Sequence, residues 1–222
     1  MRAVVRRLGE LGDDLVLAPE RWVAGADVGE GIALGDLVVE RRERGPDAGA
    51  VVLDTTHARD GLLDIAAALR AAAPPRSAKK VARAGDLVVS RLRPYLRQIA
   101  YVHPRALAAI GTRPLALSTE FYVLAPRSED AGDLAFLLPF LLGARAQAML
   151  AAAQEGGHHP RVPRASLFAL RVPRALVRDR AARGADVRVA LEAVYAALGR
   201  YRELMDADLD PRDPGAPSRR RR

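Results

Sequence analysis

The residues of this sequence with the clearest chemical potential lie close together, between positions 84 and 102. Gly85 and Asp86 form a turn signal, and the β-branched apolar residues after them predict a short strand. A second strand is expected over residues 98–102, which makes the intervening segment the tip of a hairpin. That tip carries a hydroxyl, guanidinium groups and an aromatic ring, on Ser90, Arg91, Arg93, Tyr95 and Arg97. Such a set suits an anionic, planar ligand, and nucleic acid is the natural candidate. The plainer interpretation is that these arginines only keep the hairpin soluble.

A second group of donors follows the glycine pair Gly156 and Gly157, within residues 154–173. Glycine permits backbone paths that other residues avoid, and the donors on this loop are His158, His159, Arg161 and Arg164. Paired histidines suggest a metal, but no third ligand has suitable spacing and the chain has only 4 histidines. We therefore interpret the segment as a loop that presents donors to phosphates or base edges. Lys79 and Lys80 are expected to hold phosphates.

The sequence offers no arrangement typical of catalysis. Glu120 is the only acid expected near the hairpin, and a structural ion pair with Arg91 or Arg93 suits it better than a metal. The chain has no cysteine, which excludes thiol catalysis, disulfides and Cys-ligated metals, and fits a reducing compartment. No nucleophile elbow, phosphate-binding glycine loop or metal cluster is present in the sequence. We therefore predict a protein without catalytic or metal-binding residues.

Composition and charge restrict the class of protein further. The 222 residues include 35 Lys and Arg against 27 Asp and Glu, a net charge of +8, which favours acidic partners such as nucleic acid or an anionic membrane. The longest apolar run, residues 134–142, is interrupted by Pro139 and is too short to span a bilayer. No export signal is recognisable. The sequence therefore predicts a soluble cytoplasmic protein that is not bound to a membrane.

The elements that must position the candidate residues are short. An ordered element opens at residues 34–38, and strands are expected over residues 49–56 and 115–126. The Ala- and Leu-rich residues 60–73 indicate a helix. Residues 133–153 indicate two more helices, divided at Gly143, with Asp133 as an early-turn acid.

From residue 177 to residue 205 the pattern predicts one long helix. Its apolar residues follow the heptad spacing of a coiled coil, on Val187, Leu191, Val194, Leu198, Tyr201 and Met205. Two interpretations remain open: an amphipathic helix that lies on its own domain, or a helix that pairs with a partner helix. Residues 207–222, rich in Pro, Asp and Arg, are expected to form a disordered basic tail.

Four segments in order resemble the target recognition domain of the DNA specificity (S) subunits of type I restriction–modification enzymes. Residues 34–38 (Leu-Gly-Asp-Leu-Val) resemble its opening, and residues 85–95 its central hairpin. Residues 118–126 resemble its Ser-Thr-Glu-Phe strand, residues 156–173 resemble its closing segment, and a long helix follows. A full S subunit carries two such domains and two long helices, whereas this chain has room for one of each. The basic residues 174–179 also replace the proline-rich, Glu-Gln-containing start of the family's helix.

The resemblance implies an α+β fold. An irregular, β-rich target recognition domain with peripheral helices would occupy residues 1–176, and a coiled-coil spacer helix for dimerisation would occupy residues 177–206. The subunit would be non-catalytic, reading half of a bipartite target in double-stranded DNA and directing its partners to it. Those partners would be a DNA adenine methyltransferase subunit and, in a cleaving complex, a restriction subunit. S-adenosylmethionine and ATP would belong to them, with no cofactor bound by this chain.

A single long helix suggests a homodimer. Two copies that pair their helices antiparallel would imitate a full S subunit and read an inverted repeat with a non-specific gap. A helix over residues 177–205 would be roughly 43 Å long, the same order as one turn of DNA at about 34–36 Å. The alternative function is a non-catalytic coiled-coil interaction protein whose basic surface is incidental.

Overall fold

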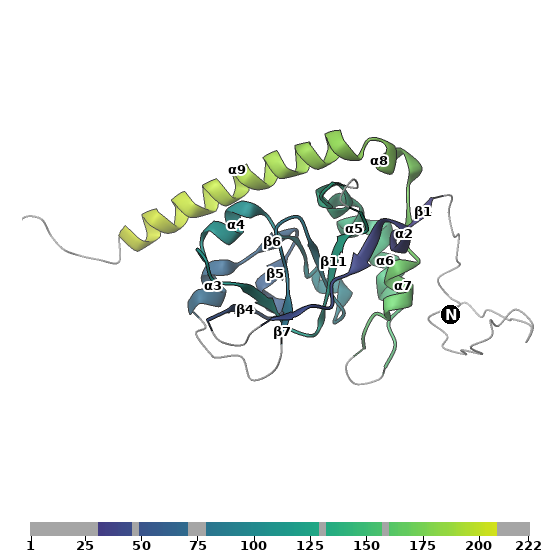
Figure 1. Cartoon of the computed structure of the whole chain (residues 1–222), viewed down its shortest axis with the longest axis horizontal. Helices are drawn as coiled ribbons and strands as arrows, with labels where there is room; N and C mark the ends of the chain where they lie inside the picture. The colour runs from purple at the N-terminus through teal and green to yellow at the C-terminus, as the bar shows by residue number, and fades with distance from the viewer. Residues whose placement is uncertain (1–30, 46–48, 71–78, 129–131, 157–159, 208–222) are drawn as a thin grey trace, which may run out of the picture.

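The computed structural model describes residues 31–45, 49–70, 79–128, 132–156 and 160–207. Within these residues a mixed body of irregular sheets and short helices carries one long helix along its side (Figure 1), and the predicted α+β fold class is confirmed. The strands are β1 (Ile32–Ala33), β2 (Val38–Glu40), β3 (Arg44–Gly45), β4 (Val51–Leu53), β5 (Ala58–Arg59), β6 (Leu62–Leu63), β7 (Lys79–Val81), β8 (Leu87–Ser90), β9 (Ile99–Tyr101), β10 (Leu115–Leu117), β11 (Phe121–Pro126) and β12 (Arg171–Val172).

The sheet that carries the hairpin is antiparallel, with the strand order β2-β11-β8-β9. β8 and β9 are the two hairpin strands that the sequence predicts, and Val88 pairs with Ala100 between them. Successive side chains of a strand point to opposite faces of the sheet. Leu87 and Val89 enter one core cluster and Val88 the other. Because core covers both faces, the strand reads as a continuous apolar run and not as an alternating one.

The second four-stranded sheet has the order β3-β7-β10-β4, with β10 parallel to β4 and antiparallel to β7. The single strand predicted over residues 115–126 is therefore wrong, because β10 and β11 belong to different sheets. The break is a polar turn: Phe121 N–H donates to the Ser118 carbonyl at 3.1 Å, and Glu120 N–H donates to Ser118 Oγ at 3.3 Å. Such local bonds compete with a continuous strand, and they place Glu120 between the sheets.

Other elements are shorter than expected. Of the helix predicted over residues 60–73, the described residues 60–70 contain a two-residue strand, β6, and a helix that begins at Ile65, and residues 71–73 lie outside the described part. The strand predicted over residues 49–56 is β4 with a 3-10 turn, capped by Asp54, after it. The division at Gly143 is confirmed, and the Asp133 carboxylate accepts the Ala135 N–H at 2.9 Å.

The helices are short apart from the last one. They are α2 (Leu34–Leu37), η2 (Thr55–His57), α3 (Ile65–Arg70), η3 (Pro94–Leu96), α4 (Pro104–Ala108), η5 (Ala135–Leu137), α5 (Leu138–Leu142), α6 (Ala144–Ala152), α7 (Arg164–Phe168), α8 (Arg174–Arg178) and α9 (Arg180–Ala207). In the described part of the chain no single helix is long and apolar enough to cross a membrane; Ala135–Leu142 and Ala144–Ala152 reach that length and composition only as a pair bent by 67°.

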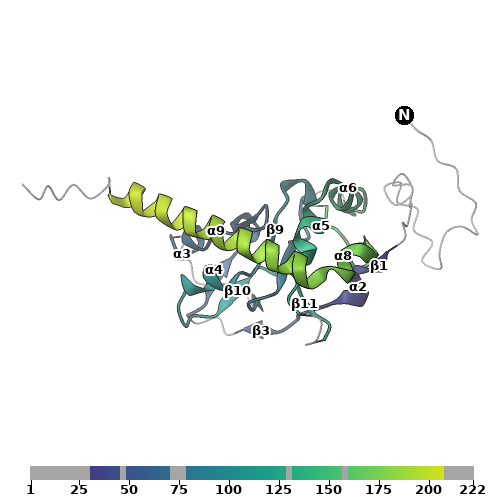
Figure 2. The same cartoon turned by 90° about the horizontal axis from the view of Figure 1, so that it is seen from above.

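The long helix α9 lies along the body, and its C-terminal end extends past it (Figures 1 and 2). It begins at Arg180, after a break at Asp179, and not at residue 177 as predicted. Val187 and Leu191 pack into the core of the chain's own body. For Leu191 the predicted role in dimerisation is wrong, because intramolecular packing buries its side chain, whereas Val187 is half-buried.

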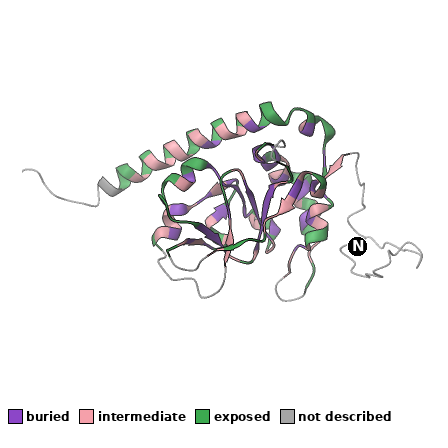
Figure 3. Ribbon diagram, viewed as in Figure 1, coloured by how far each residue is buried: buried purple, intermediate pink, exposed green. Residues whose placement is uncertain are grey.

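The remaining residues of the predicted heptad stripe are more accessible (Figure 3). Val194, Tyr201 and Met205 are 40%, 60% and 47% exposed, and Leu198 is half-buried. Leu204, beside them, is 68% exposed. The N-terminal part of the stripe therefore packs into the core, and its C-terminal part is an apolar surface exposed to solvent.

Two clusters of buried side chains form the core, one on each face of the hairpin sheet. Helices η5, α5 and α6 complete the first cluster, and β4, β10 and α4 complete the second. Tyr195 of α9 packs against both clusters. The long helix is thus an integral part of the fold.

Candidate nucleic-acid interface

The hairpin tip, residues 91–97, is a tight turn built around η3. Arg93 and Arg97, on either side of η3, adopt the left-handed conformation with φ of 45° and 52°. This conformation is uncommon for residues other than Gly, Asn and Asp, and it clusters at functional sites when the surroundings enforce it. Pro94 is buried, whereas Tyr95 is 67% exposed. Arg93 is also exposed, and no hydrogen bond or ion pair joins its side chain to any residue that the structure describes.

Two of the predicted DNA-contacting residues of the hairpin are engaged inside the fold. Ser90 is buried; its hydroxyl donates to the Leu92 carbonyl at 3.1 Å and accepts the Leu92 N–H at 3.1 Å. Arg97 donates to Asp60 Oδ1 at 2.5 Å and to the Leu142 carbonyl at 2.9 Å. Ser90 therefore shapes the tip, which corrects the prediction that its hydroxyl is available to DNA. Arg97 links the tip to the body, with its side chain 44% exposed.

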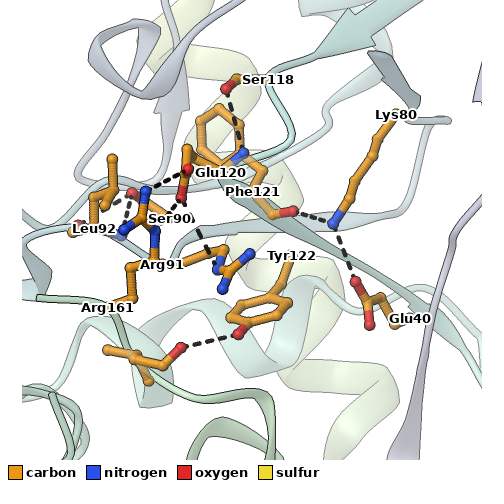
Figure 4. Close-up of polar contacts among 11 residues, drawn as sticks. Glu40, Lys80, Ser90, Arg91, Leu92, Ser118, Glu120, Phe121, Tyr122 and Arg161 are labelled. Carbon is orange, nitrogen blue, oxygen red and sulfur yellow. Dashed lines mark hydrogen bonds and ion pairs between the residues drawn. The ribbon is translucent and has the colours of Figure 1, made fainter. Parts of the chain in front are cut away.

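Glu120 holds arginines from both predicted segments (Figure 4). Arg161 donates from Nε to Oε2 at 3.0 Å and from a terminal guanidinium nitrogen to Oε1 at 2.9 Å. Arg91 Nε lies 4.0 Å from Oε2, and the Arg91 guanidinium lies over the Tyr122 ring, 5.6 Å from its centroid. The Tyr122 hydroxyl donates to the Val162 carbonyl at 2.9 Å. A bidentate arginine–carboxylate pair fixes the orientation of both groups.

The predicted ion pair between Glu120 and Arg91 is confirmed, but Arg161 is the main partner. Backbone bonds reinforce the same junction, since Arg91 N–H donates to the Glu120 carbonyl at 2.9 Å and Val162 N–H donates to the Arg91 carbonyl at 2.8 Å. The two segments that the sequence analysis treated separately therefore form one surface.

Lys80 is a structural residue. Its ammonium group donates to Glu40 Oε1 at 3.1 Å and to the Phe121 carbonyl at 2.6 Å, and its side chain is 16% exposed. Arg164 donates to the other oxygen of Glu40 at 3.0 Å and stacks on Phe168, 3.9 Å from guanidinium carbon to ring centroid. The prediction that Lys80 holds phosphates is corrected, because its ammonium group is largely buried and two of its three donors bind within the fold.

The two carboxylates at this surface titrate below the ordinary range. The hydrogen bond from Arg161 lowers the pKa of Glu120, against an opposing effect of burial, and the charges of Arg161, Arg91 and Lys80 lower it further. For Glu40 burial raises the pKa, but the hydrogen bond and charge of Lys80 and the contacts of its arginine neighbours outweigh that effect, so the pKa is lowered. Both groups therefore stay ionised at neutral pH and keep their arginines in place.

An open cavity of about 600 Å³ is lined by Glu40 and by Arg91 and Arg161, the two arginines that approach Glu120. Guanidinium groups dominate its rim, and Arg161 and Arg164 come from the loop before α7 and its first residue. The lining residues are Glu40, Arg42, Arg91, Tyr122, Glu155, Gly156, Arg161, Val162, Pro163 and Arg164. Guanidinium groups held in place by carboxylates, together with the Tyr122 ring, form a cavity that can accept a phosphate oxygen or a base edge.

The remaining predicted residues have less defined places. His158 and His159 lie outside the described residues, although the loop that contains them is closed at its base by two backbone hydrogen bonds between Glu155 and Arg161, both 2.9 Å long. Lys79 is half-buried in β7. No group of three potential metal ligands occurs among the described residues.

Sequence reasoning missed the contribution of β2 to this surface. Glu40 supplies the carboxylate for Lys80 and Arg164, and Arg42, with a side chain 72% exposed, lies on the cavity rim. The available signal was an acid followed by two arginines directly after the apolar Val38 and Val39.

The fold resembles those of solved structures. One solved structure, from work on complex assembly and conformational transition of the type I R-M system, matches with a TM-score of 0.50 at 22% sequence identity, over 85% of this chain and 50% of that chain. The fold is shared with a type I R-M protein. A crystal structure of the HsdS subunit from Thermoanaerobacter tengcongensis matches with a TM-score of 0.47 at 22% identity, with the same coverage.

The type I R-M fold is the one that the sequence resemblance implies. The chain spans about half the length of both matched proteins. A scan of protein-family models finds no match, and a search of curated proteins finds none either.

Proposed function

We propose that this chain is a sequence-specific DNA-binding specificity subunit of a type I restriction–modification-like system, acting in the cytoplasm. The observation that carries this proposal is the shared fold with a protein of the type I R-M system. The chemistry of the candidate interface supports it, because the hairpin tip carries exposed Arg93 and Tyr95 and also supplies Arg91 to a cavity lined by further arginines.

The proposed mechanism divides the arginines into two groups. Arg93 and Arg91, on the hairpin tip, would enter the major groove, where an arginine can donate two hydrogen bonds to guanine O6 and N7. Arg161 and Arg164, which line the cavity, would contact phosphates. Phosphate contacts position a protein on DNA, whereas base contacts specify sequence.

The subunit would carry out no chemistry of its own. A DNA adenine methyltransferase subunit, using S-adenosylmethionine, and a restriction subunit, using ATP, would act at the sequence that this chain selects. The chain would bind neither cofactor. Its partners would therefore be double-stranded DNA and those enzyme subunits.

A homodimer would supply the second recognition domain. The exposed apolar end of α9, formed by Leu198, Tyr201, Leu204 and Met205 together with Val194, suits pairing with the same surface of a second copy. A two-fold symmetric pair would read an inverted repeat, each copy reading one half of a bipartite target.

The same exposed surface favours a second candidate, a non-catalytic interaction protein that uses α9 alone. Such a protein would form a stable oligomer without salt-dependent DNA binding. The two candidates differ in what the arginines do, so a direct DNA-binding experiment separates them.

The test is selection of random-sequence duplex DNA by the full chain at two salt concentrations, followed by sequencing of the bound fraction. The specificity subunit predicts enrichment of a gapped inverted repeat and an affinity that falls steeply as salt rises. A continuous asymmetric site contradicts the homodimer. Absence of both enrichment and salt dependence contradicts the DNA-binding function.

A further inference from the structure

Helix α9 is fastened to the body at several points, by side chains and not by apolar packing alone. Four polar contacts occur along the helix, the first three at successive turns and the fourth two turns further on: Arg188 with Asp133, Glu192 with Arg105, Tyr195 with the Leu63 N–H, and Arg202 with Asp64. They span residues 188–202, or roughly 21 Å of helix. Anchors spread over this length fix the direction of the helix as well as its position.

Tyr195 is the central anchor. Its hydroxyl accepts the Leu63 N–H at 2.8 Å, and its ring stacks on His103, with 5.7 Å between centroids and 28° between planes. His103 in turn meets Tyr101 of β9 edge to face, with centroids 6.0 Å apart. A path of direct contacts therefore leads from α9 to the strand that returns from the hairpin tip.

Arg202 is the outermost anchor. It donates to Asp64 Oδ1 at 2.9 Å, and Asp64 lies directly before α3. The exposed apolar residues Tyr201, Leu204 and Met205 flank this anchor. The part of α9 proposed to pair with a second copy is thus the part whose direction Arg202 fixes.

We propose that Tyr195 and Arg202 are positioning residues that set the number of base pairs between the two half-sites. The inference rests on the proposed function, because it needs a dimer that reads a gapped repeat. If α9 is a lever of about 40 Å, a change of roughly 5° in its angle to the body moves the hairpin tip by about one base-pair rise, 3.4 Å. The anchors hold that angle.

The experiment compares Tyr195→Phe and Arg202→Ala with a matched control, Arg200→Ala. Arg200 is exposed on the same helix, and no hydrogen bond or ion pair joins its side chain to the described part of the chain. Tyr195→Phe retains the stacked ring and removes only the acceptor for the Leu63 N–H. Each full-length variant selects from duplex libraries in which the two half-sites are separated by every gap length over one helical turn.

Wild type and Arg200→Ala are expected to select one gap length. Tyr195→Phe and Arg202→Ala are expected to select the same half-site sequence, with the preference for the wild-type gap reduced about three- to tenfold, the effect of losing one hydrogen bond. Loss of folding alone would reduce binding equally at every gap length. The ratio of binding at the wild-type gap to binding at other gaps therefore reports positioning alone.

A second measurement follows the helix directly. The chain contains no cysteine, so spin labels on Ala165→Cys in α7 and Glu203→Cys in α9 report one distance within each chain, when diluted with unlabelled protein. A broader distance distribution in Tyr195→Phe and Arg202→Ala supports the proposal. An unchanged gap preference in both variants overturns it, and a wild-type chain that enriches no gapped sequence overturns the proposed function together with this inference.

Discussion

Arg161 donates hydrogen bonds to both carboxylate oxygens of Glu120, at 3.0 and 2.9 Å, although 41 residues separate the two in sequence. The contact joins the loop before α7 to the turn between β10 and β11. Because Arg91 also approaches Glu120, one carboxylate orders the hairpin tip and the loop together.

The pH dependence of stability tests this relationship. The pKa of Glu120 is lowered in the folded state from its ordinary value of 4.5, so its stabilising effect is complete above that value and is lost as the pH falls through the lowered pKa. Glu120→Gln should be less stable than wild type at neutral pH, and the two should converge once the pH falls below the lowered pKa of Glu120. Urea midpoints measured from pH 7 to pH 3 provide the comparison. A difference that stays constant with pH would contradict the assignment.

Removing the charge of Arg93 should weaken DNA binding without destabilising the fold. The Arg93 side chain has no hydrogen-bond or ion-pair partner among the described residues, and glutamine is an unbranched polar replacement that carries no charge. For Arg93→Gln we expect the affinity for the selected site to fall about 5- to 100-fold if a base pair is read. If a phosphate is bound, the slope of affinity against salt should fall by about one. Fluorescence anisotropy at several salt concentrations distinguishes the two.

The control for that experiment is Arg180→Gln. Arg180 is exposed at the start of α9, outside the hairpin tip and the cavity lining. An equal loss of affinity in Arg180→Gln and Arg93→Gln would mean that net charge alone drives binding.

Lys80 should contribute to the folding stability and not to the affinity for DNA. Lys80→Met removes the hydrogen bonds to Glu40 and to the Phe121 carbonyl and is expected to cost about 2 kcal/mol, as for a charged hydrogen bond. Adding Glu40→Gln should recover part of that loss, because the half-compensated carboxylate is neutralised. Chemical denaturation of the two single variants and the double variant measures the coupling. A Lys80→Met variant of normal stability with weak DNA binding would restore the phosphate-binding role.

Two leucines of α9 separate folding from association. Leu191 is buried, and Leu191→Ala is expected to cost about 2–4 kcal/mol of folding stability. Leu204 is 68% exposed, so Leu204→Ala should leave the folding stability within about 0.5 kcal/mol of wild type and weaken the dimer. Thermal denaturation and sedimentation velocity give the two readouts. A dimer unaffected by Leu204→Ala would exclude this end of the helix as the interface.

The hairpin could be predicted from sequence because its signals are local. Gly85 has a positive φ of 89°, as its place in the predicted turn requires, and the apolar runs on either side of the tip became β8 and β9. Gly143 likewise separated α5 from α6. Turn residues and apolar runs act within a few positions of the chain.

The partners of the charged residues could not be predicted in the same way. Lys80 and Glu40 lie 40 residues apart and Arg164 and Glu40 lie 124 apart, so only tertiary structure decides whether a basic residue faces solvent or a buried acid. The heptad stripe of α9 was ambiguous for a related reason. Apolar spacing shows that a face is covered, but it does not show whether the chain itself or a second copy covers Leu191.

The hairpin tip and the anchors of α9 lie at opposite ends of the same strands. Residues 91–96 follow β8, whereas Tyr101 ends β9 on the side of His103 and Tyr195. A loop cassette comprising residues 91–96 could therefore be exchanged between chains, with Ser90 and Arg97 left as fixed joints. Under the proposed function, exchanging that cassette by recombination or engineering would change which bases are recognised and would leave the contacts of α9 with the body unchanged.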